Sequence, residues 1–154
     1  MGRRAGFTVI ETVLAIVIVG MLALIAYPRI GSAVVKTDLQ SARTQVVNML
    51  STARSAATQS SRTAWLNFEG NNVFVTASPR RTVGGSGTLD TVGTVVDLTA
   101  VYGAAVTVSG GVTQIQFDPR GFAGGLGGDA VTIQLTRGGY TQTATVDALG
   151  RVQQ

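Results

Sequence analysis

The residues whose types and spacing are most informative lie at the N-terminus: Gly6, Phe7 and Glu11. A short basic leader, residues 1–6, precedes a long apolar run in which Glu11 is the only charged residue. A carboxylate inside a membrane segment costs on the order of a few kcal/mol and is usually retained for a partner or a function. Cleavage after Gly6 would create an α-amino group on Phe7, about one helical turn from Glu11. We therefore predict that Glu11 pairs with such an amine, and that pairing with a neighbouring subunit sets the axial register between packed helices.

The composition removes most enzymatic chemistry. The chain has no Cys and no His, which excludes disulfides, thiolate chemistry, imidazole metal ligands and a His general base. We expect no catalytic residue, no cofactor and no metal site. An exported enzyme would depend on acidic residues whose spacing suggests turns or caps instead: Glu69, Asp90, Asp97, Asp118, Asp129 and Asp147.

The net charge is modest for a nucleic-acid binder. The formal charge of +4 comes from 12 Lys and Arg against 8 Asp and Glu, and loss of a leader with two arginines leaves 10 against 8, or +2. The leader arginines, Arg3 and Arg4, predict by the positive-inside rule that the N-terminus stays in the cytoplasm and the remainder lies outside.

The apolar run must be a helix long enough to cross a membrane. Residues 7–27 would span about 31 Å at 1.5 Å per residue, close to the thickness of a hydrocarbon core. Pro28 removes an amide hydrogen bond and predicts a kink at the end of this segment. Gly20 is either a close-packing position or a tolerated glycine, and we favour tolerance.

An amphipathic helix is predicted over residues 30–60. Its apolar residues recur at steps of three and four and predict a face packed on a sheet: Val35, Leu39, Ala42, Val46, Met49, Ala53 and Ala57. The cations Lys36, Arg43 and Arg54 fall on the other faces, and we interpret them as solvated.

Short strands and frequent glycines after residue 62 predict a mostly antiparallel sheet domain. Trp65, Phe68 and Phe74 are predicted core residues, and residues 78–93 an irregular connection. Residues 124–128 lack the Lys-Ser/Thr ending of a phosphate loop and are interpreted as a flexible hairpin loop. The expected strands cover Thr63–Phe68, Asn72–Thr76, Thr94–Thr99, Ala105–Ser109, Val112–Phe117, Ala130–Thr136 and Tyr140–Val146.

The sequence Gly6-Phe7-Thr8-Val9-Ile10-Glu11 resembles the prepilin peptidase signature of type IV pilins and type II secretion pseudopilins. The resemblance implies cleavage between Gly6 and Phe7, N-methylation of Phe7, and a role for Glu11 in subunit assembly. An ordinary secretory signal or signal anchor is the alternative, but the run lacks a convincing Ala-x-Ala site and has Glu at its start. The implied partners are prepilin peptidase, other pilins or pseudopilins and the inner membrane.

A second motif, residues 115–123, resembles the Phe-x-Pro-x-Gly strand and turn of the GspH/FimT group of minor pseudopilins and minor pilins. This implies an α+β, pilin-like fold with a leader (residues 1–6), a transmembrane assembly helix (7–28) and a periplasmic domain (29–154), helical over about 30–60 and β-rich over 62–154. The implied protein is a single-pass inner-membrane subunit, assembled at or near the tip of a type II secretion pseudopilus or a type IV pilus.

DNA binding during natural transformation is the alternative function. DNA-uptake members of the GspH/FimT group carry a C-terminal Gly-Arg-x-Arg element, and here Gly150-Arg151 matches while Gln153 replaces the second arginine. Loss of that arginine removes a phosphate ligand. The candidate DNA contacts are Arg151, Arg137 and Arg120, although arginines scattered in solvent account for the pattern as well.

Overall fold

The structure is a computed structural model that describes residues 6–79, 88–126 and 130–153, except for the side chains at 26, 28 and 29. The leader arginines, the Arg80-Arg81 pair and the last two glycines of the 124–128 run lie outside the described residues. The chain divides into two compact units, residues 1–36 and 37–154.

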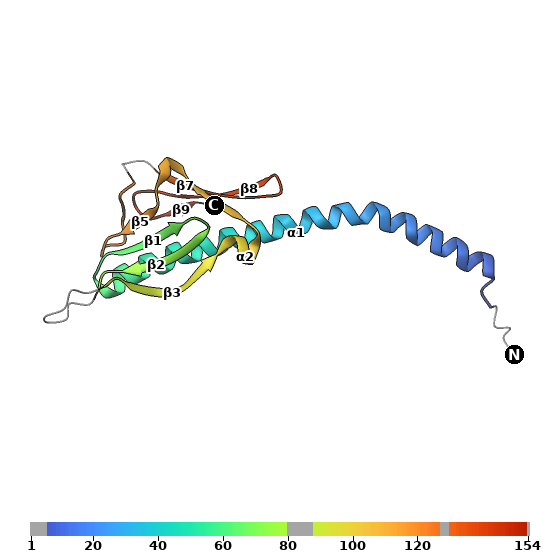
Figure 1. Cartoon of the computed structure of the whole chain (residues 1–154), viewed down its shortest axis with the longest axis horizontal. Helices are drawn as coiled ribbons and strands as arrows, with labels where there is room; N and C mark the ends of the chain where they lie inside the picture. Colours follow the sequence, from blue (N-terminus) through green and yellow to red (C-terminus); the bar gives the residue numbers. More distant parts are fainter. Residues whose placement is uncertain (1–5, 80–87, 127–129, 154) are drawn as a thin grey trace. The chain divides into compact units, whose positions relative to one another are not determined.

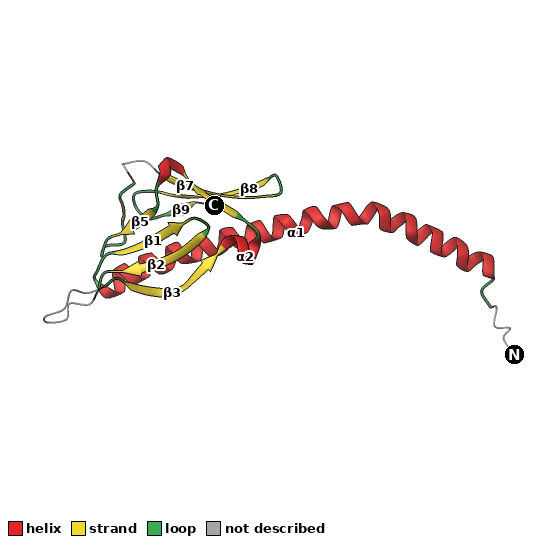
Figure 2. Cartoon of the chain, viewed as in Figure 1, coloured by secondary structure: helices red, strands yellow, loops and turns green. Residues whose placement is uncertain are grey.

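A single long helix, α1 (Val9–Ser60), contains both helices expected from the sequence (Figures 1 and 2). Its axis bends by 40° between Val9–Ile25 and Ile30–Ser60, and Pro28 lies in the intervening residues. Among the described residues no single helix has the length and apolar character to cross a membrane, whereas this bent pair has them together. The membrane span and the effect of Pro28 on it stay predictions.

The second half of α1 supplies the helical part of the core. Six of the seven residues expected on its apolar face are buried, Val35 is only half-buried, and Leu50 joins the face. Leu50 lies next to Met49 and widens the apolar stripe, as in a helix that packs on a broad surface. The buried residues of this face are Leu39, Ala42, Val46, Met49, Leu50, Ala53 and Ala57.

A five-stranded antiparallel sheet, in the order β3-β2-β1-β5-β6, forms the first sheet of the domain. The hairpin expected around Gly70 joins β1 to β2, and Ala64 pairs with Ala77. The inward residues of β1, β2 and β5 are apolar and buried, as alternation along half-buried strands requires, whereas the edge strand β3 has no buried residue. Its strands are β1 (Ala64–Glu69), β2 (Asn72–Ala77), β3 (Asp90–Asp97), β5 (Gln114–Phe117) and β6 (Ala123–Gly124).

A four-stranded antiparallel sheet, in the order β4-β7-β8-β9, forms the second. Val131, Ile133 and Leu135 of β7 are buried, whereas the intervening residues are polar. Both sheets lie alongside α1 in Figure 1, and side chains of α1 bond to β8 and to the turn after it. The strands are β4 (Ala105–Val108), β7 (Val131–Arg137), β8 (Tyr140–Val146) and β9 (Val152–Gln153), with a short 3-10 turn η1 (Ser109–Gly111) after β4.

The expected strand Thr94–Thr99 is wrong at both ends. Strand β3 begins four residues earlier, inside the segment expected to be irregular, and ends at Asp97. Asp97 then caps a short helix, α2 (Leu98–Tyr102), by accepting hydrogen bonds from the backbone N–H groups of Thr99 and Ala100. Because an N-cap aspartate directs the chain into a helix, the strand stops there.

Two of the three expected core aromatics lie on the outer face of the first sheet. Phe68 is buried beside Leu66 on the inner face, whereas Trp65 and Phe74 are half-buried. Successive side chains of a strand point to opposite faces, and the register pairs Trp65 with Thr76 and Phe74 with Asn67. The strand period thus overrides the hydrophobicity of these two residues.

Candidate functional sites

The peptide bond between Gly6 and Phe7 lies outside the helix. Residues 6–8 have no regular secondary structure, all three are exposed, and the side chain of Phe7 is 78% exposed. Helix α1 begins at Val9, directly after this non-helical segment. A backbone bond within a helix must be unwound before a protease can hold it, so this placement leaves the Gly6–Phe7 bond accessible.

Thr8 begins α1 as its N-cap. The Thr8 hydroxyl accepts a hydrogen bond from the backbone N–H of Glu11 at 3.3 Å, and Thr-x-x-Glu is the sequence signature of a capping box. Glu11 therefore occupies the first turn, where a negative side chain is favoured by the helix dipole. Sequence reasoning missed this local role, although the spacing of Thr8 and Glu11 already carried the signal.

The apolar residues that follow are exposed within the chain. Nearly every large apolar side chain in this segment is at least half exposed. An apolar surface of this extent indicates contact with a membrane or another protein. The set comprises Val9, Ile10, Val13, Leu14, Ile16, Val17, Ile18, Val19, Met21, Leu22, Leu24 and Ile25.

A second candidate site begins at the turn between β5 and β6, which contains the Pro-Arg-Gly of the second sequence motif. The Asp118 carboxylate accepts hydrogen bonds from the N–H groups of Arg120 and Phe122, both at 2.9 Å. The Gly121 N–H donates to the Asp118 carbonyl at 2.9 Å, and the Asp118 N–H donates to the Phe122 carbonyl at 3.0 Å. Gly121 has φ +84°, a left-handed conformation that favours glycine.

The turn between β8 and β9 repeats this hydrogen-bond pattern. The Asp147 carboxylate accepts from the N–H of Arg151 at 2.8 Å, Gly150 donates to the Asp147 carbonyl, and Asp147 donates to the Arg151 carbonyl. Gly150 has φ +70°. Both are three-residue hairpin loops closed by a left-handed glycine, with the shared pattern Asp-x-x-Gly-x.

The two turns are in contact. The Ala123 N–H donates to the Ala148 carbonyl at 3.1 Å, and a Cβ on Gly150 would lie 2.6 Å from the Gly121 carbonyl oxygen. The two sequence motifs thus form one structural unit, which we call the twin turns (residues 118–122 and 147–151). Sequence reasoning treated them separately because nothing in the spacing indicates that the two sheets meet here.

Arg54 of α1 holds the twin turns from the helix side. Its Nη1 donates to the Gly150 carbonyl at 3.3 Å, and its Nε is 2.9 Å from the position of a Cβ on Gly121. Arg54 is therefore not simply a solvated cation. Arg43, unlike the exposed Arg54, is half-buried, and it donates to Gln142 of β8 at 3.3 Å.

The twin turns bring together two of the three candidate DNA-contacting arginines. Arg120 and Arg151 are both exposed, and Arg151 forms a long ion pair of 3.9 Å with Asp147. Arg137 pairs instead with Asp38 at 2.5 Å and also donates to the Tyr102 carbonyl. Asp38 and Arg54 are 16 residues apart on α1, or about 24 Å at 1.5 Å per residue. Arg137 thus lies at another part of the domain.

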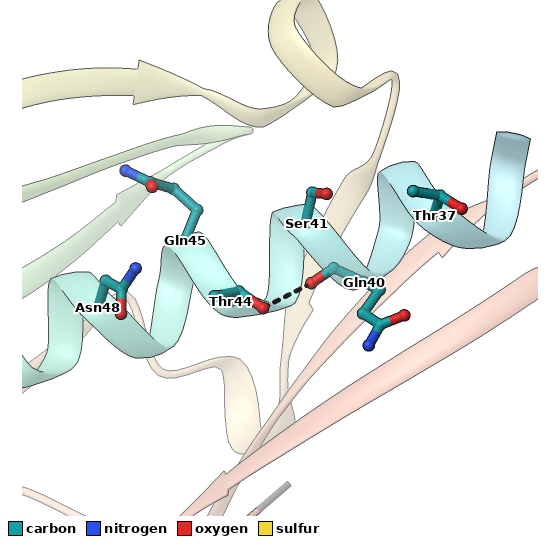
Figure 3. A pocket seen from close by; sticks show the side chains of 6 residues that line it. All are labelled: Thr37, Gln40, Ser41, Thr44, Gln45 and Asn48. Atoms are coloured by element: carbon teal, nitrogen blue, oxygen red, sulfur yellow. Dashed lines mark hydrogen bonds between the residues drawn. The ribbon is translucent and has the colours of Figure 1, made fainter.

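A hollow along α1 is lined by no charged side chain and is a poor candidate for a catalytic or metal site. Figure 3 shows its lining, which consists of uncharged polar side chains from one face of the helix, with the Thr44 hydroxyl donating to the Gln40 carbonyl at 2.9 Å. Within the described residues, no group of three or more acidic side chains is placed to hold a metal ion. The lining residues are Thr37, Gln40, Ser41, Thr44, Gln45 and Asn48.

Comparison with known proteins defines the class of the fold. Residues 1–27 match the family model of the prokaryotic N-terminal methylation motif, and the rest of the chain folds as a helix with antiparallel sheets. The chain thus combines an N-terminal methylation motif with the pilin-like α+β fold expected from its sequence. No curated protein matches it in sequence.

The fold is similar to that of the type IV minor pilin FimU of Pseudomonas aeruginosa, strain PAO1. One crystal form of FimU is 19% identical over 77% of this chain and 88% of that chain, with a TM-score of 0.57. A second form is 20% identical over 75% and 90% of the respective chains, with a TM-score of 0.56. At this identity the likeness establishes the shared fold.

Proposed function

We propose that this chain is a minor pilin, a structural subunit that is processed by prepilin peptidase and assembled into an inner-membrane-rooted filament. The observation that carries the proposal is the placement of Gly6 and Phe7 in an exposed, non-helical segment directly before a capped apolar helix. In this proposal the peptidase cuts between Gly6 and Phe7 and Phe7 is then N-methylated. The filament is a type IV pilus or a type II secretion pseudopilus, with the subunit at or near the tip.

The assembly step uses the exposed first half of α1. Before assembly the apolar run lies in the inner membrane, with the leader in the cytoplasm and the domain in the periplasm; afterwards, helices of other subunits cover it. The Glu11 carboxylate pairs with the methylated amine of a neighbouring subunit's first residue, since a charge taken into an apolar filament core requires a partner. The subunit itself catalyses nothing.

Replacement of Glu11 tests this role. Glu11→Ala is expected to leave cleavage intact but to lower the amount of the chain in sheared filaments at least about tenfold. The matched control is Glu69→Ala, which removes an exposed carboxylate at the end of β1. Both the membrane and filament fractions would be quantified by immunoblot. Normal incorporation of Glu11→Ala would overturn the pairing.

DNA binding remains a second candidate, supported by the proximity of Arg120 and Arg151 on the twin turns. Binding through phosphates weakens steeply with salt. If this candidate is right, full-length protein in detergent shifts duplex DNA at low salt, and Arg120→Gln/Arg151→Gln abolishes that shift. Absence of any shift at low salt would remove this candidate.

A further inference from the structure

The exposed side chains of the twin turns are of two kinds. Phe122 and Leu149 are 44% and 43% exposed, and Arg120 and Arg151 flank them in the same turns. We call these four side chains the twin-turn patch. Each is the residue immediately before or after a buried left-handed glycine.

The backbone under this patch is preorganised. Each turn is closed by an aspartate that accepts backbone hydrogen bonds, and the two turns are joined by the bond from Ala123 to Ala148. Arg54 donates a hydrogen bond to the Gly150 carbonyl and lies against Gly121 from the helix side. A rigid surface loses little conformational entropy when a partner binds, and aromatic residues and arginine are enriched among the residues that dominate protein interfaces.

The charge of the patch favours a protein partner over nucleic acid. The two turns hold two arginines and two aspartates, Asp118 and Asp147, and the neighbouring Arg54 brings the formal charge of this surface to only +1. Nucleic-acid affinity comes from neutralising several phosphates, and a surface with a net charge of about +1 gives a weak field for that purpose. Two exposed apolar side chains, each two positions from an exposed arginine, instead complement an apolar residue flanked by carboxylates.

We propose that the twin-turn patch is the docking surface for the globular domain of a neighbouring pilin subunit, which presents an apolar side chain flanked by carboxylates. This inference rests on the proposed function and adds to it the surface and the chemistry of one neighbour. The Phe122 and Leu149 side chains bury against the partner's apolar residue, and Arg120 and Arg151 pair with its carboxylates.

Photo-crosslinking in cells tests the inference with the full chain. A benzophenone amino acid would be placed at Leu149 and, as a control, at Gln134, which is exposed on the outer face of the second sheet. The expected result is an adduct at Leu149, at least about tenfold stronger than at Gln134, with a subunit that carries its own N-terminal methylation motif. Arg151→Glu should reduce that adduct at least about tenfold, and reversing a carboxylate in the cross-linked partner peptide should restore it.

The outcomes separate this inference from the proposed function. A chain that is cleaved after Gly6 and present in filaments, yet gives no adduct above the Gln134 level, overturns the docking surface while the minor-pilin proposal stands. An adduct with nucleic acid likewise overturns it. A chain that is neither cleaved nor found in filaments overturns both.

Discussion

The two halves of α1 differ in where their apolar partners are found. In the first half, Ile10 and Leu24 are each 78% exposed, whereas Leu39 and Val46 in the second half are fully buried. Both halves are helical, but the first is apolar on every face, whereas the second carries an apolar stripe that packs on sheets of its own chain. Packing within the domain therefore accounts for the apolar residues of the second half, whereas those of the first half require a partner outside this chain.

The largest effect is expected from a cavity in the buried half. Leu50→Ala removes a fully buried side chain and should destabilise the domain by about 2–5 kcal/mol. Leu22→Ala, at a position 60% exposed, is the matched control and should leave domain stability unchanged. Urea unfolding of the full chain in detergent, followed by fluorescence of the single tryptophan, measures both. Equal effects of the two variants would contradict the comparison.

The contact between the twin turns gives the next largest effect. Gly150→Ala must adopt φ +70° and bring its Cβ to 2.6 Å from the Gly121 carbonyl oxygen, which should cost about 2–3 kcal/mol. Gly139→Ala has φ +81° with nothing within 4 Å, and should cost only the conformational part, about 1–2 kcal/mol. The same unfolding measurement compares them, and a Gly150→Ala variant no less stable than Gly139→Ala would mean that the turns do not touch.

The ion pair between Arg137 and Asp38 should contribute less. Both side chains are about a third exposed, so solvent screens the pair, and Arg137→Met should cost about 1 kcal/mol from the lost pair and the lost bond to Tyr102. Arg120→Met, at an exposed arginine, should change stability by less than about 0.5 kcal/mol. A shift in the urea midpoint for the first variant alone is the expected result.

The smallest effect is expected at Gly20 in the exposed half. A Cβ there meets nothing within 4 Å in the chain, and alanine favours a helix over glycine by about 1 kcal/mol. Gly20→Ala should therefore assemble into filaments at the normal level. Loss of assembly with normal membrane insertion would show that Gly20 is a close-packing position between helices of neighbouring subunits.

Sequence reasoning predicted the elements whose signal is local. The helix spans, the β1–β2 hairpin at Gly70 and the strands β4, β7 and β8 follow from periodicity and turn residues. Sequence reasoning failed to predict which face of the sheet the aromatic residues occupy. Trp65 and Phe74 face outward because the strand period places Leu66 and Phe68 inward. It also missed α2, whose single turn is set by the Asp97 cap.

The candidate sites show the same division. Gly6, Phe7 and Glu11 could be read from six consecutive residues, whereas the twin turns required two segments that are 29 positions apart, from Asp118 to Asp147, to be brought into contact. The repeated Asp-x-x-Gly pattern was visible in the sequence, but it is too short to be recognised as a repeat without the shared hydrogen bonds. Placement of Arg137 beside Asp38 depended likewise on tertiary packing.

The most direct test of the account is the intact mass and N-terminal sequence of the protein extracted from membranes, in cells with and without prepilin peptidase. The account predicts a chain that starts at N-methylated Phe7 when the peptidase is present and an intact leader when it is absent. A leader that is retained in both strains, or a cut well beyond Pro28, would contradict it.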